Sequence, residues 1–270
     1  MTIATAHADY HNAVSIIYVP YHLDEHVPDL DVALPADTGV TEVRVDLPEA
    51  DVWSRLGRLY ESTAGAVESA VHAGTAPAVV SGDCTASVGV AAGLQRAGLD
   101  ASVVWFDAHG DVQTLETTTS GYLGGMALRF LLGYGSDLVG GRLGLRPVAE
   151  ERVLLVDARD LDPPEVEYLA SARLGRSTVD GLSAEALPAG PLLLNLDLDI
   201  VDPADLPGLR FPAPGGPDAE AVLRAALTVL ASGRVAAVNI ACTWHPGSAD
   251  PDGTRERLVA AVLAGVRDRP

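Results

Sequence analysis

The sequence predicts a three-layer α/β/α fold, in which helices cover both faces of a mostly parallel β-sheet. Short apolar runs rich in branched residues alternate with longer amphipathic segments, a pattern typical of strands joined by crossover helices. The chain has 270 residues, of which 48% are hydrophobic, and this is enough for one large buried core. We therefore predict a single domain over residues 1–270.

Each element is predicted from its own hydrophobic pattern. The predicted strands are short apolar runs bounded by turn-forming residues, at 14–19, 42–45, 77–80, 102–106, 152–156, 192–196 and 235–240. Apolar residues at three- and four-residue spacing predict helices at 51–73, 86–97, 125–132, 164–172, 218–231 and 254–266. The Gly- and Pro-rich segments 135–147 and 206–217 are predicted loops, because strand and helix patterns resume after each.

Charge and composition exclude several classes of protein. The 37 acidic residues outnumber the 18 basic ones, which gives a formal charge of -19 and excludes a nucleic-acid binder held by phosphate contacts. All of the basic residues are arginine, so a phosphate-binding loop lysine and a lysine Schiff base are excluded together. The acidic surface is predicted to serve solubility.

The sequence also predicts where the protein works. Residues 1–11 lack the basic start and apolar run of a signal peptide, and no run of about 18 apolar residues predicts a membrane span. We therefore expect a cytoplasmic protein without membrane contact. The two cysteines, Cys84 and Cys242, are too few for a disulfide scaffold, which agrees with a reducing compartment.

Residues that can bind metals or catalyse reactions follow several predicted strands directly. These segments are 81–84, 107–111, 157–162, 197–202 and 241–245. Ligands of open parallel sheets bind in the crevice outside the carboxyl ends of the strands, so we expect the five segments to form one site.

Two of these segments carry carboxylates at alternating positions. In extended chain, residues two apart face the same way, so Asp107, His109 and Asp111 are expected to converge, as are Asp197 and Asp199. Clustered carboxylates repel one another unless cations neutralise them. Oxygen ligands with one imidazole suit Mn²⁺, and bridging carboxylates can hold two ions about 3.5–4 Å apart. A single Asp in such a position is more often a turn or helix cap, an interpretation that stays open for Asp162 and Asp202.

Three motifs resemble those of the arginase and agmatinase (ureohydrolase) family. They are Gly82-Asp83-Cys84, Asp107-Ala108-His109-Gly110-Asp111 and Asp197-Leu198-Asp199-Ile200-Val201-Asp202-Pro203. The resemblance implies an arginase-like α/β/α fold, a manganese centre and a homo-oligomer. It makes Asp107 and Asp197 shared ligands, with His109 and Asp199 completing one metal position and Asp111 and Cys84 the other. Because Cys84 stands where the family has histidine, and thiolate suits Zn²⁺ better than Mn²⁺, we expect one or two Mn²⁺ ions.

The same resemblance implies an amino-acid substrate. Gln113, Thr118 and Ser120 stand at the positions with which arginases hold the α-carboxylate, and Asp162 stands where the α-amino group is bound. The expected partner is therefore a small guanidino amino acid.

Two departures from the family pattern bear on the substrate. Gly124 replaces the histidine that precedes Gly-Met in arginases, and Cys242 stands where the glutamate that pairs with the guanidinium is expected. An uncharged contact at Cys242 is a poorer partner for a full cation, so a less basic, modified guanidine loses less by the exchange. The pattern is similar to that of a bacterial subgroup with cysteine in the first motif, which includes N-hydroxyarginine hydrolase.

Three functional hypotheses follow. The leading one is metal-dependent hydrolysis of a guanidino carbon–nitrogen bond in an arginine-like amino acid, with N-hydroxyarginine, giving ornithine and hydroxyurea, as a candidate; Asp111 accepts and returns the proton. A second makes Cys84 or Cys242 a covalent nucleophile. The third is a catalytically degenerate ureohydrolase paralogue that binds or assembles. Four N-terminal histidines are predicted to lie in a solvated loop: His7, His11, His22 and His26.

Overall fold

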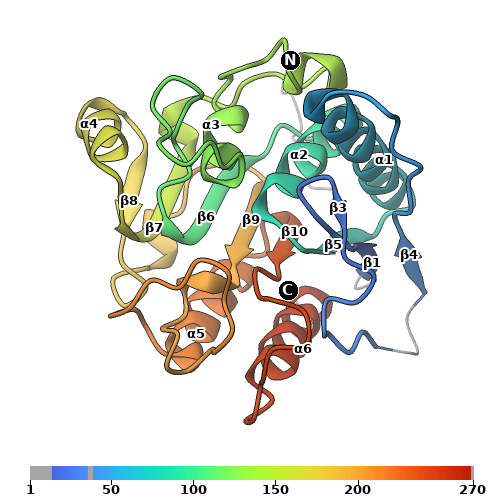
Figure 1. Ribbon diagram of the computed structural model, residues 1–270. Coiled ribbons are helices and arrows are strands. Elements are labelled where there is room, and N and C mark those ends of the chain that lie inside the picture. Colours follow the sequence, from blue (N-terminus) through green and yellow to red (C-terminus); the bar gives the residue numbers. More distant parts are fainter. Residues whose placement is uncertain (1–13, 36–38, 269–270) are drawn as a thin grey trace, which may run out of the picture.

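The computed structural model describes residues 14–35 and 39–268, and an eight-stranded parallel sheet lies at its centre (Figure 1). The strand order is β4-β1-β5-β10-β9-β6-β7-β8, and every neighbouring pair is parallel. The strands are β1 Val14–Val19, β4 Val40–Glu42, β5 Ala76–Ser81, β6 Ser102–His109, β7 Val153–Asp160, β8 Gly175–Ser177, β9 Leu192–Asp197 and β10 Val235–Ala241. The predicted parallel α/β sheet is confirmed.

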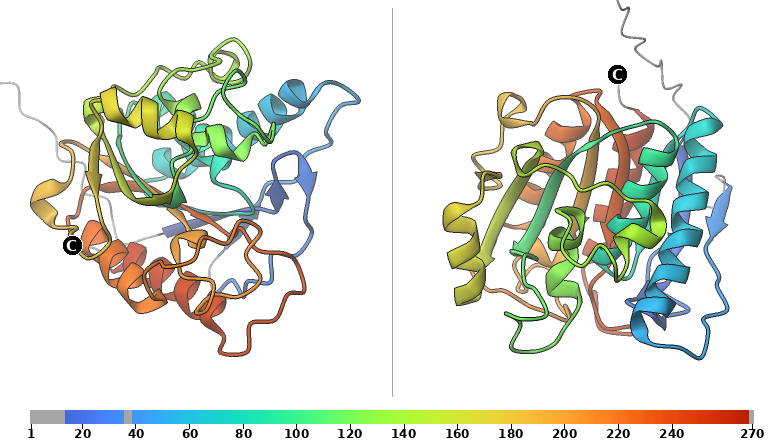
Figure 2. Two further views of the ribbon diagram at one scale, coloured as in Figure 1. Left: turned by 60° about the vertical axis from the view of Figure 1, so that its left-hand side comes forward. Right: turned by 90° about the horizontal axis from the view of Figure 1, so that it is seen from above.

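Helices cover both faces of this sheet (Figure 2). They are α1 Val52–His72, α2 Ser87–Arg96, α3 Ala127–Leu131, α4 Pro163–Ser171, α5 Ala219–Leu230 and α6 Thr254–Arg267. The first four contribute to one buried apolar cluster and the last two to the other, which confirms the three layers. Within the part of the chain that is described, no helix combines the length and apolarity needed to cross a membrane.

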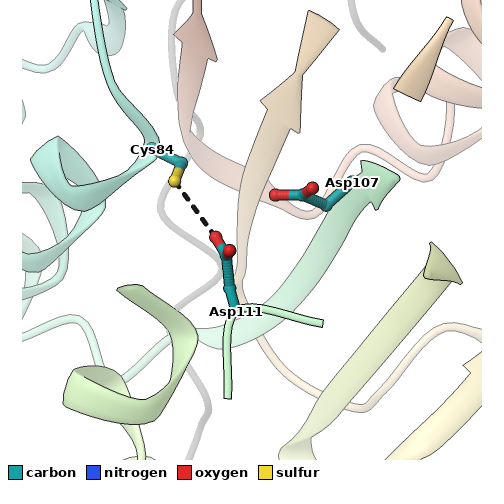
Figure 3. A group of neighbouring side chains, drawn as sticks. All are labelled: Cys84, Asp107 and Asp111. Atoms are coloured by element: carbon teal, nitrogen blue, oxygen red, sulfur yellow. Dashed lines mark hydrogen bonds between the residues drawn. The ribbon is translucent and has the colours of Figure 1, made fainter. Parts of the chain in front are cut away.

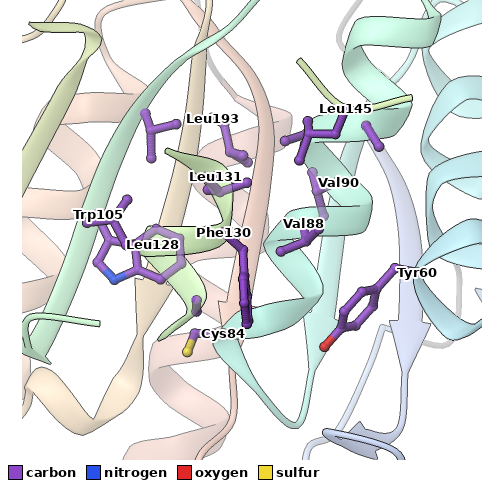
Figure 4. Close-up of a cluster of buried hydrophobic side chains, with 14 of the residues drawn as sticks. Tyr60, Cys84, Val88, Val90, Trp105, Leu128, Phe130, Leu131, Leu145 and Leu193 are labelled. Carbon is purple, nitrogen blue, oxygen red and sulfur yellow. The ribbon is translucent and has the colours of Figure 1, made fainter. Parts of the chain in front are cut away.

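Alternation along the strands divides the core between the two layers. On β9, Leu193 packs in the layer of α1 to α4, whereas Leu194 packs in the layer of α5 and α6. Figure 4 shows the first of these layers, with Trp105 and Leu131 packed in it and Cys84 among the same side chains. Gly93 lets α2 approach α1, since a Cβ there would lie 2.5 Å from the Ala64 carbonyl oxygen.

The structure adds elements that the sequence pattern did not predict. Tyr21–His22 and Glu25–His26 form a short antiparallel hairpin, β2 and β3, and β8 is a polar edge strand without an apolar run. The strand predicted at 42–45 lies instead at 40–42, where its exposed residues pair only with β1. Such short or exposed strands lack the hydrophobic periodicity on which strand prediction rests.

Candidate metal centre and substrate cavity

The carboxyl ends of four neighbouring strands, β5, β10, β9 and β6, enclose a cavity of about 260 Å³. All six side chains predicted as metal ligands line it: Cys84, Asp107, His109, Asp111, Asp197 and Asp199. Segments more than a hundred residues apart in sequence meet here because parallel strands end at the same edge of the sheet.

Asp107, His109 and Asp199 form the first group that could hold a metal ion, with one ligand atom of each within 4.8 Å of the others. His109 Nδ1 lies 3.2 Å from Asp107 Oδ1 and 3.3 Å from Asp199 Oδ2. Burial lowers the pKa of His109, but hydrogen bonds to Asp107 and Asp199 outweigh it and raise the pKa to about 12. In the protein without metal, a proton on His109 therefore partly balances the two carboxylates.

Cys84, Asp107 and Asp111 form a second such group, which shares Asp107 with the first (Figure 3). The Cys84 thiol donates to Asp111 Oδ2 over 3.1 Å. Cys84 begins a 3-10 helix directly after β5, and Asp83 caps this helix by accepting from the Thr85 backbone N–H. Asp111 has a φ of 54°, a left-handed conformation that Asp tolerates better than most residues.

The electrostatics of the cavity fit bound cations. Burial and the charge of Asp107 raise the pKa of Asp111 and bring that of Asp199 to about 6, and burial together with Asp199 raises that of Asp197. Among the described residues, Asp199 Oδ1 is a buried carboxylate oxygen without a hydrogen-bond partner. A buried, repelling carboxylate set with an unpaired oxygen is a donor set that a divalent cation would complete.

Asp197 lines the same cavity but belongs to neither group of three, so its role as a shared ligand stays a prediction. Its Oδ1 accepts hydrogen bonds from the Asp199 backbone N–H over 3.0 Å and from the Thr243 hydroxyl over 2.6 Å. In the segment after β10, Thr243 lines the cavity, whereas Cys242 packs in the apolar layer of α5 and α6.

The four residues predicted to bind the amino-acid end of a substrate also line the cavity: Gln113, Thr118, Ser120 and Asp162. Gln113 Nε2 donates to Asp162 Oδ2 over 2.9 Å, so the two candidate contacts are already joined. Thr118 Oγ1 and Ser120 Oγ lie 3.4 Å apart on an exposed loop. The segments predicted to bind the metal and the amino-acid end of the substrate therefore meet at one cavity.

Glu165 is a cavity residue that the sequence analysis missed. It is buried at the start of α4, where Oε1 accepts from the Val112 backbone N–H over 3.2 Å and Oε2 accepts from the Asp162 backbone N–H over 3.1 Å. Burial raises the pKa of Glu165. The Asp162-x-x-Glu165 spacing of a capping box was the available sequence signal.

A group of aromatic side chains at the cavity was missed as well. Tyr122 and Phe211 line the cavity, and His22 on β2 stacks on Tyr122 with ring centroids 5.8 Å apart. His22 is buried, with Nδ1 3.1 Å from the Gly82 carbonyl oxygen and Nε2 3.3 Å from the Tyr122 hydroxyl. The prediction that His22 lies in a solvated loop is wrong, because the β2-β3 hairpin folds against the end of β5.

His26, by contrast, is exposed, and His7 and His11 lie outside the described residues. The local sequence around His22 offers no periodic pattern from which its burial could be predicted.

The two cysteines are poor candidates for a nucleophile. Burial, and then the charge of Asp111, raises the pKa of Cys84 well above that of a free thiol. Burial likewise raises the pKa of Cys242. Because the thiolate is the reactive form, these environments disfavour covalent catalysis at neutral pH.

Comparison with known proteins gives consistent matches. Residues 3–264 match the model of the arginase family. The arginase of Bacillus caldovelox is 35% identical over 170 residues, which are 58% of this chain and 57% of that protein. The chain thus aligns with little more than half the length of that relative. The N(omega)-hydroxy-L-arginine amidinohydrolase of Streptomyces lavendulae is 30% identical over 190 residues, covering 68% of this chain and 66% of that protein.

The fold comparison covers more of the chain. The solved structure of the Bacillus caldovelox arginase superposes with a TM-score of 0.78 at 24% identity, over 96% of this chain and 99% of the other. The predicted arginase-like architecture is confirmed.

Proposed function

The chain belongs to the arginase family, and from this premise we propose that it hydrolyses a guanidino carbon–nitrogen bond in an arginine-like amino acid. The observation that carries the proposal is the pair of three-residue groups that share Asp107 at the floor of one cavity. Two adjoining ligand sets with a common carboxylate are suited to hold two cations close together.

The donor set fits a manganese-type ion at the first group. Asp107 and Asp199 offer oxygen and His109 offers nitrogen, ligands that suit Mn²⁺. At the second group the Cys84 sulfur would favour a softer ion such as Zn²⁺. We therefore propose one or two bound ions, Mn²⁺ at the first group. When bound, such ions lower the pKa of water and polarise the substrate.

Asp111 is the proposed acid–base residue of the reaction. It lines the cavity beside Asp107, and its pKa is raised by burial, so it can hold a proton nearer neutral pH than an ordinary carboxyl. We assign it the transfer of a proton from the attacking water to the departing nitrogen. Tyr122 and Phe211 border the same cavity with apolar ring surface.

The far side of the cavity supports recognition of an amino acid. The hydroxyls of Thr118 and Ser120 and the Gln113 amide can donate to a carboxylate, and Asp162 can accept from an ammonium group. The four side chains lie in the same cavity as the candidate metal ligands. A substrate with an amino-acid group at one end and a guanidino group at the other requires this arrangement.

The substrate we propose is a guanidine of reduced basicity, N-hydroxyarginine, which would yield ornithine and hydroxyurea. After β10 the cavity is bordered by Thr243, a neutral side chain, and the neighbouring Cys242 keeps its proton because burial raises its pKa. A neutral side chain at this position weakens the binding of a less basic guanidine less than it weakens the binding of a full cation. The 30% identity to a relative named for hydrolysis of this substrate supports the choice.

Product analysis tests the proposal. The purified protein, supplied with Mn²⁺, is incubated with arginine, N-hydroxyarginine and agmatine, and urea, hydroxyurea and ornithine are measured. We expect hydroxyurea and ornithine from N-hydroxyarginine at a higher kcat/KM than urea from arginine. Asp107→Asn should abolish release, and Asp180→Asn, at an exposed site outside the cavity, serves as its matched control. Absence of urea and hydroxyurea from every guanidine would refute the proposal.

A binding or assembly protein is the second candidate, favoured by one observation. Cys84 is a buried thiol with a raised pKa, and such a group resists conversion into the thiolate ligand that a second ion needs. The two candidates differ in metal analysis combined with turnover. One tightly held ion per chain without hydrolysis of any guanidine would favour the binding protein.

A further inference from the structure

An aromatic wall borders the cavity beside the candidate metal centre. It consists of Phe211, on the loop between β9 and α5, and Tyr122, which both line the cavity, and of His22, which stacks on these two rings outside the cavity lining. The Phe211 ring centroid lies 4.5 Å from that of Tyr122 and 6.4 Å from that of His22. These three residues come from three separate segments of the chain, so the aromatic wall is a tertiary feature and not the packing of one loop.

This aromatic wall extends over both groups of candidate ligands. Phe211 meets His109 of the first group edge-on, with centroids 6.5 Å apart and an angle of 89° between the planes. Tyr122 donates from its hydroxyl to Asp83 Oδ2 over 3.2 Å, next to Cys84 of the second group. A substrate group that lies between the two ligand groups would therefore be close to these rings.

The Tyr122 ring is fixed in place from two sides. His22 Nε2 holds its hydroxyl over 3.3 Å, and a Cβ added to Gly124 would overlap the ring. Glycine at 124 thus leaves room for the phenol. Burial, and then the charge of Asp83, raises the pKa of Tyr122, so the phenol is neutral and offers no charge to a guanidinium.

The chemistry of the wall matches a planar, weakly hydrated group. A guanidino group stacks on aromatic faces, and a guanidinium gains a cation–π attraction there. The carboxylates of the two ligand groups are proposed to hold metal ions, and the Asp83 carboxylate, which is outside the cavity lining, accepts from the Tyr122 hydroxyl. The residue after β10 that lines the cavity is neutral Thr243. The Phe211 ring is therefore a surface suited to this group.

We propose that Phe211, whose ring packs against Tyr122 with centroids 4.5 Å apart, is a specificity-determining residue that binds the guanidino plane of the substrate by stacking in place of a paired carboxylate. This inference rests on the proposed hydrolysis of a guanidino amino acid.

A pair of variants tests the role of the ring. Phe211→Leu keeps an apolar side chain of similar size and removes the aromatic face, whereas Phe211→Tyr keeps the face. We expect Phe211→Leu to raise KM for N-hydroxyarginine and arginine about two- to thirty-fold, with a smaller change in kcat. Phe211→Tyr should raise KM less. Phe211 is partly exposed, so both variants are expected to fold, and circular dichroism checks this.

Binding of ornithine is the discriminating control, because ornithine has the same amino-acid end and no guanidino group. The titrations use metal-loaded protein that carries Asp111→Asn, because the expected loss of kcat leaves arginine intact. Calorimetry should show that adding Phe211→Leu weakens arginine binding and leaves ornithine binding within about two-fold. Equal weakening of both ligands, or of neither, would overturn the inference. Failure of the wild type to hydrolyse any guanidine would instead refute the proposed function, since the ratio of arginine to ornithine binding is measured without turnover.

Discussion

The thiol of Cys84 donates a hydrogen bond to Asp111 Oδ2 over 3.1 Å, and this contact joins the end of β5 to the loop after β6. Both side chains are buried, and they act on each other in opposite directions. The charge of Asp111 raises the pKa of Cys84, whereas the hydrogen bond from the thiol stabilises the Asp111 carboxylate and opposes the rise in its pKa. A cation in this group must displace the thiol proton, so its affinity depends on Cys84.

Replacing each cysteine in turn should separate a ligand from a core residue. Cys84→Ala is expected to lower the metal bound after dialysis by about one ion per chain, with a larger effect for Zn²⁺ than for Mn²⁺, because a sulfur ligand is lost. Cys242→Ala is the matched control, since Cys242 is equally buried but lies outside the cavity lining. Elemental analysis measures both variants. An unchanged metal content in Cys84→Ala would contradict the assignment.

Metal binding should stabilise the protein more at high pH than at low pH. The pKa of Asp199 in the folded protein is about 6, above its ordinary 3.8, so its stabilising proton is fully present below pH 3.8 and is lost as the pH rises through 6. The pKa of His109, about 12 against 6.5, acts in the same direction, fully below pH 6.5 and fading toward 12. Both effects weaken the metal-free protein as the pH rises.

The measurement is the difference in Tm between protein with Mn²⁺ and protein treated with a chelator, taken at each pH. Titratable groups far from the metal affect both Tm values equally, so they cancel in the difference. We expect this difference to grow between pH 5 and pH 8, as protons compete less for the ligands. A difference of equal size at every pH would show that these protons do not compete with the metal.

Asp111→Asn tests the acid–base role with little change of shape. Asn is nearly isosteric with Asp and tolerates the left-handed conformation that residue 111 adopts, with φ of 54°. We expect kcat to fall about 10²- to 10⁴-fold, the usual range for a general acid–base residue. Metal content is measured alongside, since Asp111 also belongs to the second ligand group. A kcat within a few-fold of wild type would assign the proton transfer elsewhere.

The sequence predicted the sheet and the ligand segments because both depend on local pattern. Buried parallel strands such as β6 and β9 are apolar runs, and the aspartates that follow them necessarily meet at one edge of the sheet. Asp107 and Asp199 are nearly a hundred positions apart in the sequence, yet this topology alone places both in one cavity.

The residues that were missed are placed by tertiary contacts. His22, on a two-residue strand, stacks on the cavity residue Tyr122, and Phe211 reaches the cavity on a loop rich in Gly and Pro. Neither segment has a periodic pattern that marks one side as buried. The displacement of Cys242 from the cavity in favour of Thr243 depends on which way the chain turns after β10. A shift of one residue exchanges the two faces of a strand.

Glu165 should position two parts of the cavity at once. Its two oxygens accept from the backbone N–H groups of Val112, next to Asp111, and of Asp162, so it fixes the proposed acid–base residue relative to the proposed amino-group contact. Gln has one acceptor oxygen and one amide nitrogen, so Glu165→Gln must leave one of these N–H groups without its acceptor. An unpaired buried donor costs about 1–3 kcal/mol.

We therefore expect Glu165→Gln to lower the free energy of unfolding by about 1–3 kcal/mol and to raise KM more than it lowers kcat, because the substrate contacts loosen while the side chains of the metal groups stay unchanged. Glu167→Gln is the matched control, an exposed substitution of the same kind on the same helix, α4. Urea denaturation and steady-state kinetics on both variants give the comparison. If Glu165→Gln and Glu167→Gln behave alike, the two backbone contacts do not hold the cavity together, and the spacing of Asp111 and Asp162 must be set by the strand β6 and helix α4 themselves.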